Sequence, residues 1–267
     1  MPTYLQQLLA PKKRTPQGLR YLENVIRQYA PSVIQAKQVD EIHNAFSQVF
    51  YKSFNNNISE FIKSGSRAKG TAIKGGSDID FVVVFKANAF NSIEKMYNTT
   101  EAFLKQYGPV RRQNVSFGLR VEQWEIDVTP AKKQTALSST LSIRNNRTKS
   151  YIETNIKQHI NFIRGSGCKK EIMAMKIWNK QQQLDLESFL IEVAVIQVLK
   201  NKWGYNLEKR LQIVLDFFAG ELFKQQIVDP AKPSNILNAD IDGMQKFKTI
   251  IATFAPRTSA SWADFIK

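Results

Sequence analysis

Three aspartates of this chain have the residue type and spacing that could bind metal ions. Asp78 and Asp80 stand two residues apart at the start of a strongly apolar run, Ile79–Phe85. In a strand, this spacing places both side chains on one face, where two carboxylates repel each other. A pair of divalent cations about 3.5–4 Å apart would remove that repulsion, and ligands made only of oxygen favour Mg²⁺ or Mn²⁺.

Asp127 is the candidate for a third carboxylate at such a site. It lies in a segment, residues 124–128, in which apolar residues alternate with acids. In a strand Asp127 therefore faces away from Ile126 and Val128, as a ligand on an adjacent strand should. We expect Asp78, Asp80 and Asp127 to hold one ion, and Asp78 and Asp80 to hold a second.

A glycine- and serine-rich stretch before the two acids has the residues of a phosphate-binding turn. Gly65-Ser66 follows a predicted strand and leads into a short helical stretch, so backbone N–H groups and a hydroxyl could surround β- and γ-phosphates. Lys69 and Lys74 add positive charge nearby. Gly75-Gly76 allows a sharp turn into the acidic strand.

Each of these features also has an ordinary structural explanation. A Gly-Ser pair before a helix is commonly a turn and a cap, an Asp-x-Asp pair is commonly a solvated loop, and Asp127 alone could be an acid on an edge strand. The combination favours the catalytic interpretation, because these features follow one another in a fixed order. A predicted strand leads to Gly-Ser, and about a dozen residues later Ser77-Asp-Ile-Asp begins a buried strand.

The surrounding pattern predicts an α+β fold, with a mixed sheet and helices followed by a helical half. We expect a catalytic domain over residues 1–150, braced by N-terminal helices, and a helical lobe over residues 151–267, with helices only after about Ser150. In the first half the predicted helices are residues 19–30, 31–51 and 90–107, and the predicted strands are Ile58–Lys63, Ile79–Phe85, 114–117 and 121–128. In the second half the predicted helices are residues 151–164, 168–179, 186–203 and 207–223, with another after Asp240.

The charge balance favours polyanionic partners. The 267 residues include 38 Lys and Arg against 23 Asp and Glu, a net charge of +15, and a pI near 9.8. The excess is spread along the chain, so it belongs to the folded body. Two explanations stay open: an RNA activator that binds a basic outer face, or a site built for several nucleoside triphosphates.

The sequence argues against several other classes of protein. Cys168 is the only cysteine, which excludes an intrachain disulfide, and with only His43 and His159 besides, a structural zinc site is not expected. The first ten residues lack the pattern of a secretory signal. The apolar runs at residues 81–85 and 189–199 are too short to span a bilayer. We therefore expect a cytoplasmic protein without a membrane partner.

The Gly65-Ser66 and Asp78-x-Asp80 pair, with Asp127 downstream, resembles the nucleotidyltransferases of the polymerase-β type over about residues 58–130. A narrower resemblance comes from the second half, where residues 173–178, 188–192 and 228–235 are similar to the second lobe of the oligoadenylate synthetase group. Within that group the sequence looks most like the bacterial CD-NTases, the cyclic-oligonucleotide synthases of antiphage defence. The resemblance implies a polymerase-β-like palm with an α-helical C-terminal lobe.

The resemblance also implies two further nucleotide ligands. In that group a helix lysine and a following serine contact the triphosphate of the donor nucleotide, and they correspond to Lys176 and Ser188 here. Lys176 lies on a largely apolar helix, where its charge needs a partner; the alternative is a lysine that extends to solvent at the helix edge. Ser188 lies near a helix start, so its alternative is N-terminal capping.

We therefore expect a Mg²⁺- or Mn²⁺-dependent enzyme that joins nucleoside triphosphates, ATP among them, with release of pyrophosphate. The resemblance implies a cyclic di- or oligonucleotide product. Three alternatives stay open: a template-independent enzyme that extends the 3′ end of tRNA or another RNA, a toxin that transfers a nucleotide to tRNA or protein, and an inactive RNA-binding module. The chain lacks an obvious additional tRNA-binding domain, and its three acids argue against an inactive module. No local spacing identifies the bases used, the linkage or the oligomeric state.

Overall fold

The computed structural model describes residues 17–75 and 78–267, and these residues form two compact units. The sheet unit comprises residues 31–72 and 78–161, and the helical unit comprises residues 17–30, 73–75 and 162–267. These units differ from the halves expected on either side of residue 150, because the first described helix and a short piece near residue 74 group with the C-terminal helices. Gly76 and Ser77 lie outside the described residues.

The sheet unit is built on one mixed sheet, which contains seven strands in the described part of the chain. The strands are β1 (Ile58–Lys63), β2 (Ile79–Phe85), β3 (Val110–Arg112), β4 (Phe117–Val121), β5 (Trp124–Lys133), β6 (Leu141–Asn145) and β7 (Ser150–Thr154). The main order is β1-β2-β5-β4-β3, and β6 pairs with both β5 and β7. The pairing of β2 with β5 is parallel, and the other pairings are antiparallel.

The central strand β2 is covered on both faces, as its continuous apolar run predicts. Phe81, Val83 and Phe85 lie in one apolar cluster with residues of β4, β5 and two helices. Val82 and Val84 lie in a second, smaller cluster with residues of β5 and β6. The first residues of β2 and β5 therefore stand at the end of a strand pair that is held on both sides.

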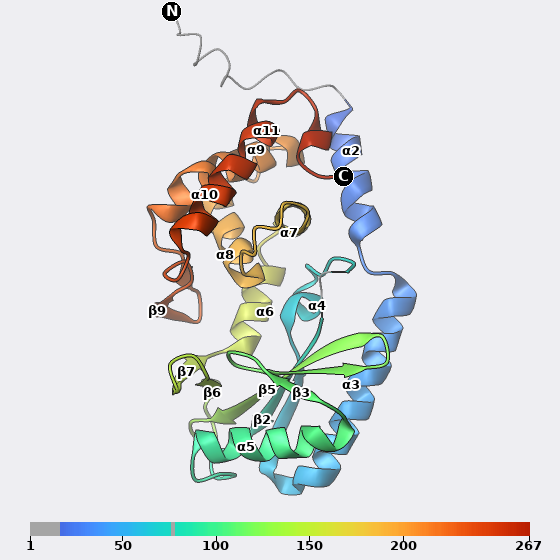
Figure 1. Cartoon of the computed structure of the whole chain (residues 1–267), viewed down its shortest axis with the longest axis vertical. Coiled ribbons are helices and arrows are strands. Elements are labelled where there is room, and N and C mark those ends of the chain that lie inside the picture. The colour runs from blue at the N-terminus through green and yellow to red at the C-terminus, as the bar shows by residue number, and fades with distance from the viewer. Residues whose placement is uncertain (1–16, 76–77) are drawn as a thin grey trace, which may run out of the picture. The chain divides into compact units, whose positions relative to one another are not determined.

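Two helices of the sheet unit (Figure 1) contribute side chains to the larger of these two clusters. They are α3 (Val33–Phe54) and α5 (Ile93–Leu104); the unit also contains α4 (Gly65–Lys69), η1 (Asn55–Asn57), η2 (Lys105–Tyr107) and the start of α6 (Ile156–Arg164). The second predicted helix begins at Val33 rather than at Pro31, because Ser32 and Gln35 form a capping box.

Two sequence predictions for the sheet are wrong. The turn between β4 and β5 falls at Glu122, whose φ is +54°. Gly118, which lies between the predicted strands 114–117 and 121–128, is therefore inside β4. The chain after Ser150 is not purely helical, since residues 150–154 form β7 and pair with β6. The local sequence does not reveal this hairpin, because β6 follows a polar segment rich in Ser and Thr. The position of β6 is set by its pairing with β5.

The helical unit is built around two largely buried helices, α7 and α8. Its elements are α2 (Gly18–Tyr29), the end of α6, α7 (Lys169–Gln181), α8 (Ser188–Leu199), α9 (Leu207–Ala219), η3 (Glu221–Phe223), the hairpin of β8 (Val228–Asp229) and β9 (Lys232–Ile236), α10 (Gly243–Ala252), α11 (Phe254–Thr258) and η4 (Trp262–Asp264). Every residue from Glu171 to Trp178 of α7 is buried. Trp178 is fully buried and packs near Phe218 and Phe265.

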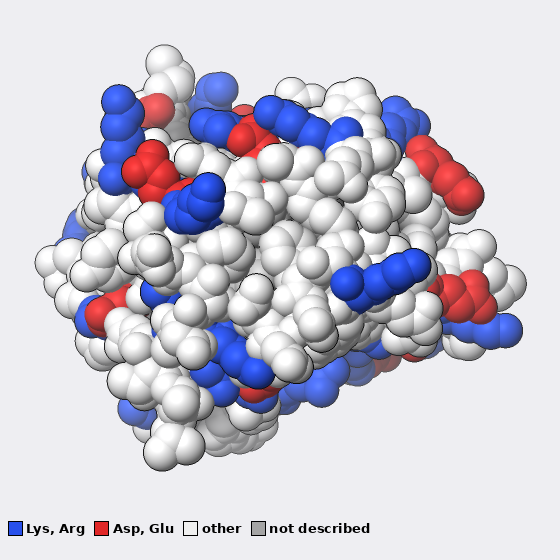
Figure 2. Space-filling view, turned by 90° about the horizontal axis from the view of Figure 1, so that it is seen from below, with Lys and Arg blue, Asp and Glu red and all other residues white. Residues whose placement is uncertain are grey.

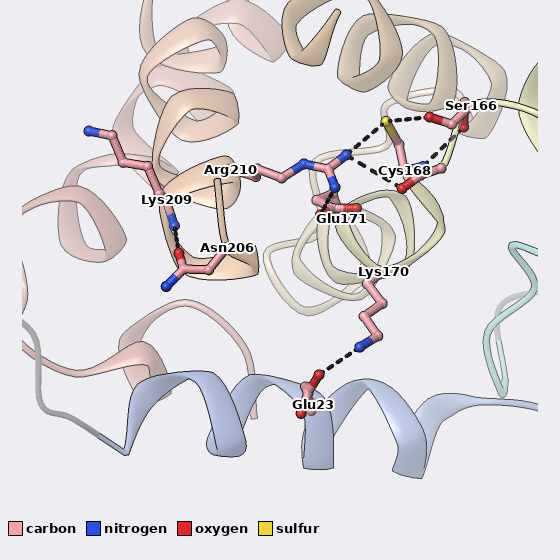
Figure 3. A network of polar contacts seen from close by, with 9 residues as sticks. Glu23, Ser166, Cys168, Lys170, Glu171, Asn206, Lys209 and Arg210 are labelled. Carbon is pink, nitrogen blue, oxygen red and sulfur yellow. Dashed lines mark hydrogen bonds and ion pairs between the residues drawn. The ribbon is translucent and has the colours of Figure 1, made fainter. Parts of the chain in front are cut away.

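Arg210 of α9 fixes the start of α7, as Figure 3 shows. One guanidinium nitrogen lies 3.2 Å from the buried Glu171 carboxylate, and the other lies 3.2 Å from Cys168 Sγ. Burial raises the pKa of the Cys168 thiol, despite the nearby guanidinium, which lowers it. Cys168 is therefore a packed, neutral residue of the helix start.

Two features of the described residues concern a membrane and polyanions as possible partners. No described helix is both long enough and apolar enough to cross a bilayer. On the face shown in Figure 2, separated basic side chains stand beside acidic ones, with uncharged areas between them.

Candidate active site

Two of the three predicted acids lie side by side at the start of parallel strands. Asp80 of β2 and Asp127 of β5 are direct register partners. Ile126 and Val128, on either side of Asp127, are fully buried in the larger cluster, so Asp127 projects from the opposite face of the sheet. The predicted alternation in β5, and the predicted adjacency of its acid to β2, are confirmed.

Gly65 is required by its contact with Asp80. A Cβ atom on Gly65 would lie 1.8 Å from Oδ2 of Asp80, which no side chain could tolerate. Gly65 also has φ of +61°, a backbone conformation that favours glycine. The backbone is held there because the N–H of Ser64 donates to the carbonyl of Asp80 at 2.8 Å. The Gly65-Ser66 turn thus touches the acidic strand, and Ser66 follows as the second residue of α4.

Asp78 immediately precedes β2, in a strongly charged environment. Burial raises the pKa of its carboxyl, the charge of Glu125 raises it further, and Arg111 and Arg67 lower it. Arg67 of α4 is itself affected, because burial lowers the pKa of its guanidinium while Asp80 and Asp78 raise it. Its guanidinium lies 5.5 Å from the ring centre of Trp124. Arg67 therefore supplies positive charge beside the acids.

The pKa of the Asp127 carboxyl is strongly raised. Burial, followed by the negative charge of Asp78, raises the pKa of Asp127 to about 6. Gln113 acts in the opposite direction, because its Nε2 donates a hydrogen bond of 2.9 Å to Asp127 Oδ1. A carboxyl group whose pKa lies close to neutral pH, at the start of two paired strands, is suited to proton transfer.

The acids suit hard cations by their chemistry. Among residues 17–75 and 78–267, no three Asp, Glu, His or Cys side chains are gathered closely enough to hold a metal ion as they stand. Asp78 and Asp127 nevertheless repel each other enough to raise the pKa of Asp127, and a divalent cation would relieve that repulsion. Their donors are carboxylate oxygens only, which are the ligands that Mg²⁺ and Mn²⁺ prefer.

The four predicted basic and hydroxyl ligands divide between the two units. Lys69 belongs to α4 of the sheet unit. Lys74, Lys176 and Ser188 belong to the helical unit, where Lys74 is held by a backbone hydrogen bond to Tyr29. Lys176 and Ser188 line one cavity of about 390 Å³, together with Ile73, Asn179, Lys180, Gln183, Asp185 and Leu186.

Lys176 has the ionic partner that its apolar helix requires. Its Nζ lies 2.6 Å from Oε1 of Glu192 on α8, and both side chains are at most 5% exposed. The alternative of a lysine extending to solvent is therefore wrong. Ser188 is the first residue of α8 and Glu187 is the cap residue, so the capping alternative for Ser188 is wrong as well.

Sequence reasoning missed three residues that act on these groups. Gln113, Arg67 and Glu192 each contact or influence a predicted ligand, although none was given a role from the sequence. Glu192 could have been found, since it is the one acid in the apolar run 189–196 and lies on a helix buried nearly all round. The contact of Gln113 depends on the pairing of β3 with β4, which local spacing does not fix.

Comparison with known families identifies the first part of the chain. Residues 20–166, more than half of the chain, match the Second Messenger Oligonucleotide or Dinucleotide Synthetase domain, SMODS. No curated protein matches the chain.

Several solved structures share the fold over most of the chain. CdnC of E. coli MS115-1, solved with ATP, is 18% identical with a TM-score of 0.71, over 88% of this chain and 89% of that chain. The CdnE cyclic dinucleotide synthase of Elizabethkingia meningoseptica, solved with GTP and Apcpp, is 17% identical with a TM-score of 0.64, over 87% and 94%. The Cid1 poly(U) polymerase with Mg and 3′-dATP is 13% identical with a TM-score of 0.67, over 91% and 93%.

The predicted α+β class and polymerase-β-like nucleotidyltransferase fold are confirmed by this agreement. The chain is a nucleotidyltransferase and belongs to the SMODS family of second messenger oligonucleotide or dinucleotide synthetases.

Proposed function

We propose that this protein joins nucleoside triphosphates, with release of pyrophosphate, and closes the product into a cyclic di- or oligonucleotide that serves as a signal in antiphage defence. The observation that carries the proposal is the register pairing of Asp80 with Asp127, beside the Gly65-Ser66 turn, in a chain of the SMODS family. The RNA-extending alternative is supported only by similarity of fold, as with Cid1 and an RNA terminal U-transferase, and the family match favours a second messenger.

The acids would hold two divalent ions, Mg²⁺ or Mn²⁺. Asp78, Asp80 and Asp127 would bind one, and Asp78 and Asp80 the other. When bound, such ions lower the pKa of a ribose hydroxyl and offset the charge of the triphosphate and of departing pyrophosphate. Asp127 would also accept the proton of the attacking hydroxyl.

The remaining predicted residues would bind phosphate. Backbone N–H groups and the hydroxyl of Gly65-Ser66 would donate to the triphosphate next to Asp80, with Lys69 and Lys74 adding positive charge. Lys176 and Ser188 would offer a cation and a hydroxyl to phosphates within the cavity that they line. The RNA activator and the cytoplasmic location stay predictions.

One experiment tests both whether the product is cyclic and whether Asp80 is needed to form it. Purified protein is incubated with α-³²P-labelled ATP, GTP, CTP and UTP and Mg²⁺ or Mn²⁺, treated with phosphatase and examined by mass spectrometry. A cyclic product keeps one phosphate per nucleoside, whereas a linear one loses its terminal phosphates. We expect the wild type to form the cyclic product and Asp80→Asn to form it at least about a thousandfold more slowly, because a metal carboxylate is lost.

The matched control is Asp40→Asn in the same unit. Asp40 pairs with Lys63 on the surface, where such pairs contribute little, so this variant should keep wild-type activity. Full activity of Asp80→Asn would refute the assignment of the acids. Label found only in added tRNA or protein would favour the alternative transferases.

Gly65→Ala tests whether the turn holds the Asp80 carboxylate. The new methyl group would occupy the position of Asp80 Oδ2, so we expect product formation to fall by about a hundredfold or more, with a loss of about 1–3 kcal/mol in the free energy of unfolding. Gly108→Ala is the control, because Gly108 also has a positive φ but nothing lies within 4 Å of its added Cβ. That variant should lose stability while keeping activity; equal losses of activity in both variants would disprove a specific contact.

Asp127→Asn should stabilise the metal-free protein at pH 7 while abolishing turnover. The folded-state pKa of about 6 exceeds the ordinary value of about 3.9, so the folded protein binds more protons than the unfolded chain between these values. Asp127 therefore costs stability above pH 6, and the cost disappears as the pH falls below about 4. This difference in pKa corresponds to a loss of at most about 3 kcal/mol in the free energy of unfolding, and of about 1 kcal/mol after solvent screening.

Thermal unfolding in EDTA measures this effect. At pH 7 the melting temperature of Asp127→Asn should exceed that of the wild type by about 2–4 °C, and the difference should shrink towards pH 4. A melting temperature below that of the wild type at pH 7 would show that the Asp127 charge is stabilising.

A further inference from the structure

Gln113 is the one side chain that the described residues place in a hydrogen bond with Asp127. Its Nε2 donates to Asp127 Oδ1 at 2.9 Å. We infer that Gln113 is a positioning residue, which fixes the Asp127 carboxylate so that its other oxygen is presented to a divalent cation. This inference rests on the proposed function, since it assigns a supporting role to a residue beside a proposed metal ligand.

The orientation of the Gln113 amide is set from its far side. The hydroxyl of Ser116 donates to Gln113 Oε1 at 2.7 Å, and Ser116 is buried, with 5% of its surface exposed. With the amide oxygen occupied in this way, the NH₂ group is the end that faces Asp127. A flipped amide would place its oxygen against a carboxylate, which is repulsive. Ser116, Gln113 and Asp127 therefore form a directed chain of hydrogen bonds.

The backbone of this turn is also held. The N–H of Gln113 donates to the carbonyl of Ser116 at 3.0 Å, and the Gln113 carbonyl accepts from Asn146 Nδ2 at 2.6 Å. The same Asn146 amide group donates to the hydroxyl of Tyr97, a side chain buried on α5. The position of Gln113 is thus determined by Ser116, which immediately precedes β4, and by residues of the β6–β7 turn and α5.

Gly118 leaves the space that the Gln113 side chain occupies. Gly118 is the register partner of Asp127 on β4. A Cβ atom on Gly118 would lie 2.9 Å from Gln113 Nε2 and 3.0 Å from a terminal nitrogen of Arg111. A larger residue at position 118 would therefore push these two side chains away from Asp127, although the backbone itself lacks the positive φ that would exclude alanine.

The chemistry of an amide suits this role. A glutamine orients the carboxylate without cancelling its charge, whereas an arginine or lysine would form an ion pair that competes with the cation. The hydrogen bond takes Oδ1 and leaves Oδ2 for the metal. Groups that orient metal ligands in this way commonly affect metal affinity or activity by about 10–100-fold.

The test compares Gln113→Ala with the wild type in two measurements. Binding of Mn²⁺ alone is followed by electron paramagnetic resonance of the free ion, and product formation is followed with labelled nucleotides. We expect Gln113→Ala to weaken Mn²⁺ binding by about tenfold and to lower kcat by about 10–100-fold, with the KM for the nucleotide changed less than twofold. A purely structural role would lower the melting temperature without this separation of kcat from KM.

Gln134→Ala is the matched control, because Gln134 Nε2 also donates to a carboxylate, that of Glu153, at an exposed position beyond the end of β5. This variant should behave as the wild type. Gly118→Ala provides a second route to the same effect, since it displaces the Gln113 amide while keeping glutamine. It should lower Mn²⁺ affinity and kcat in the same direction as Gln113→Ala.

The outcomes separate this inference from the proposed function. If the wild type forms product and both Gln113→Ala and Gly118→Ala match Gln134→Ala, the positioning role is overturned and the function stands. If the wild type forms no nucleotide product but Gln113→Ala weakens Mn²⁺ binding, the positioning role stands and the function fails. Absence of Mn²⁺ binding to the wild type would overturn the positioning role.

Discussion

Asp80 and Asp127 stand side by side as register partners at the start of two parallel strands, where the charge of Asp78 also acts on Asp127, and the sheet unit has to hold these carboxylates there. The remainder of β2 supplies the holding force, because its side chains are buried in two apolar clusters on opposite faces. Full burial of a single Phe or Val side chain contributes about 1.5–3 kcal/mol. Several such residues along one strand can offset the cost of carboxylates that are partly desolvated and unneutralised.

The same constraint explains the residues that surround the acids. Gly65 has no side chain because the Asp80 carboxylate occupies that space. Arg67 supplies positive charge, and Gln113 supplies a neutral donor. The helical unit differs, since Lys176 and Glu192 are paired and buried there, and the buried Glu171 pairs with the partly buried Arg210. The sheet unit holds several acids close to one another, whereas the two buried acids of the helical unit, Glu192 and Glu171, each lie beside a basic side chain.

The pattern of apolar and polar residues is sufficient to predict the strands that carry the acids. The apolar run of β2 and the alternation of apolar and acidic residues in β5 correctly predict that Asp80 and Asp127 lie on adjacent strands. The β6–β7 hairpin and the β4–β5 turn could not be predicted in this way, because pairing with β5 decides them. Gln113 was missed for the same reason: its contact with Asp127 forms only after β3, β4 and β5 are brought together.

The site shows the same division between local and long-range information. A partner for Lys176 was expected from its apolar helix, but the sequence did not select Glu192, which lies on the next helix. The carboxylates were expected to surround metal ions, and the described side chains are not gathered into a closed metal cage. Carboxylates brought close together repel one another, so a closed cage of acids needs a cation to offset that repulsion.

Anomalous diffraction from crystals grown with Mn²⁺ and a non-hydrolysable ATP analogue tests the central claim most directly. The account predicts two manganese peaks about 3.5–4 Å apart, both within coordination distance of Asp78 and Asp80 and one of them also of Asp127. A nucleotide bound without manganese at these carboxylates, or manganese bound elsewhere, would contradict it.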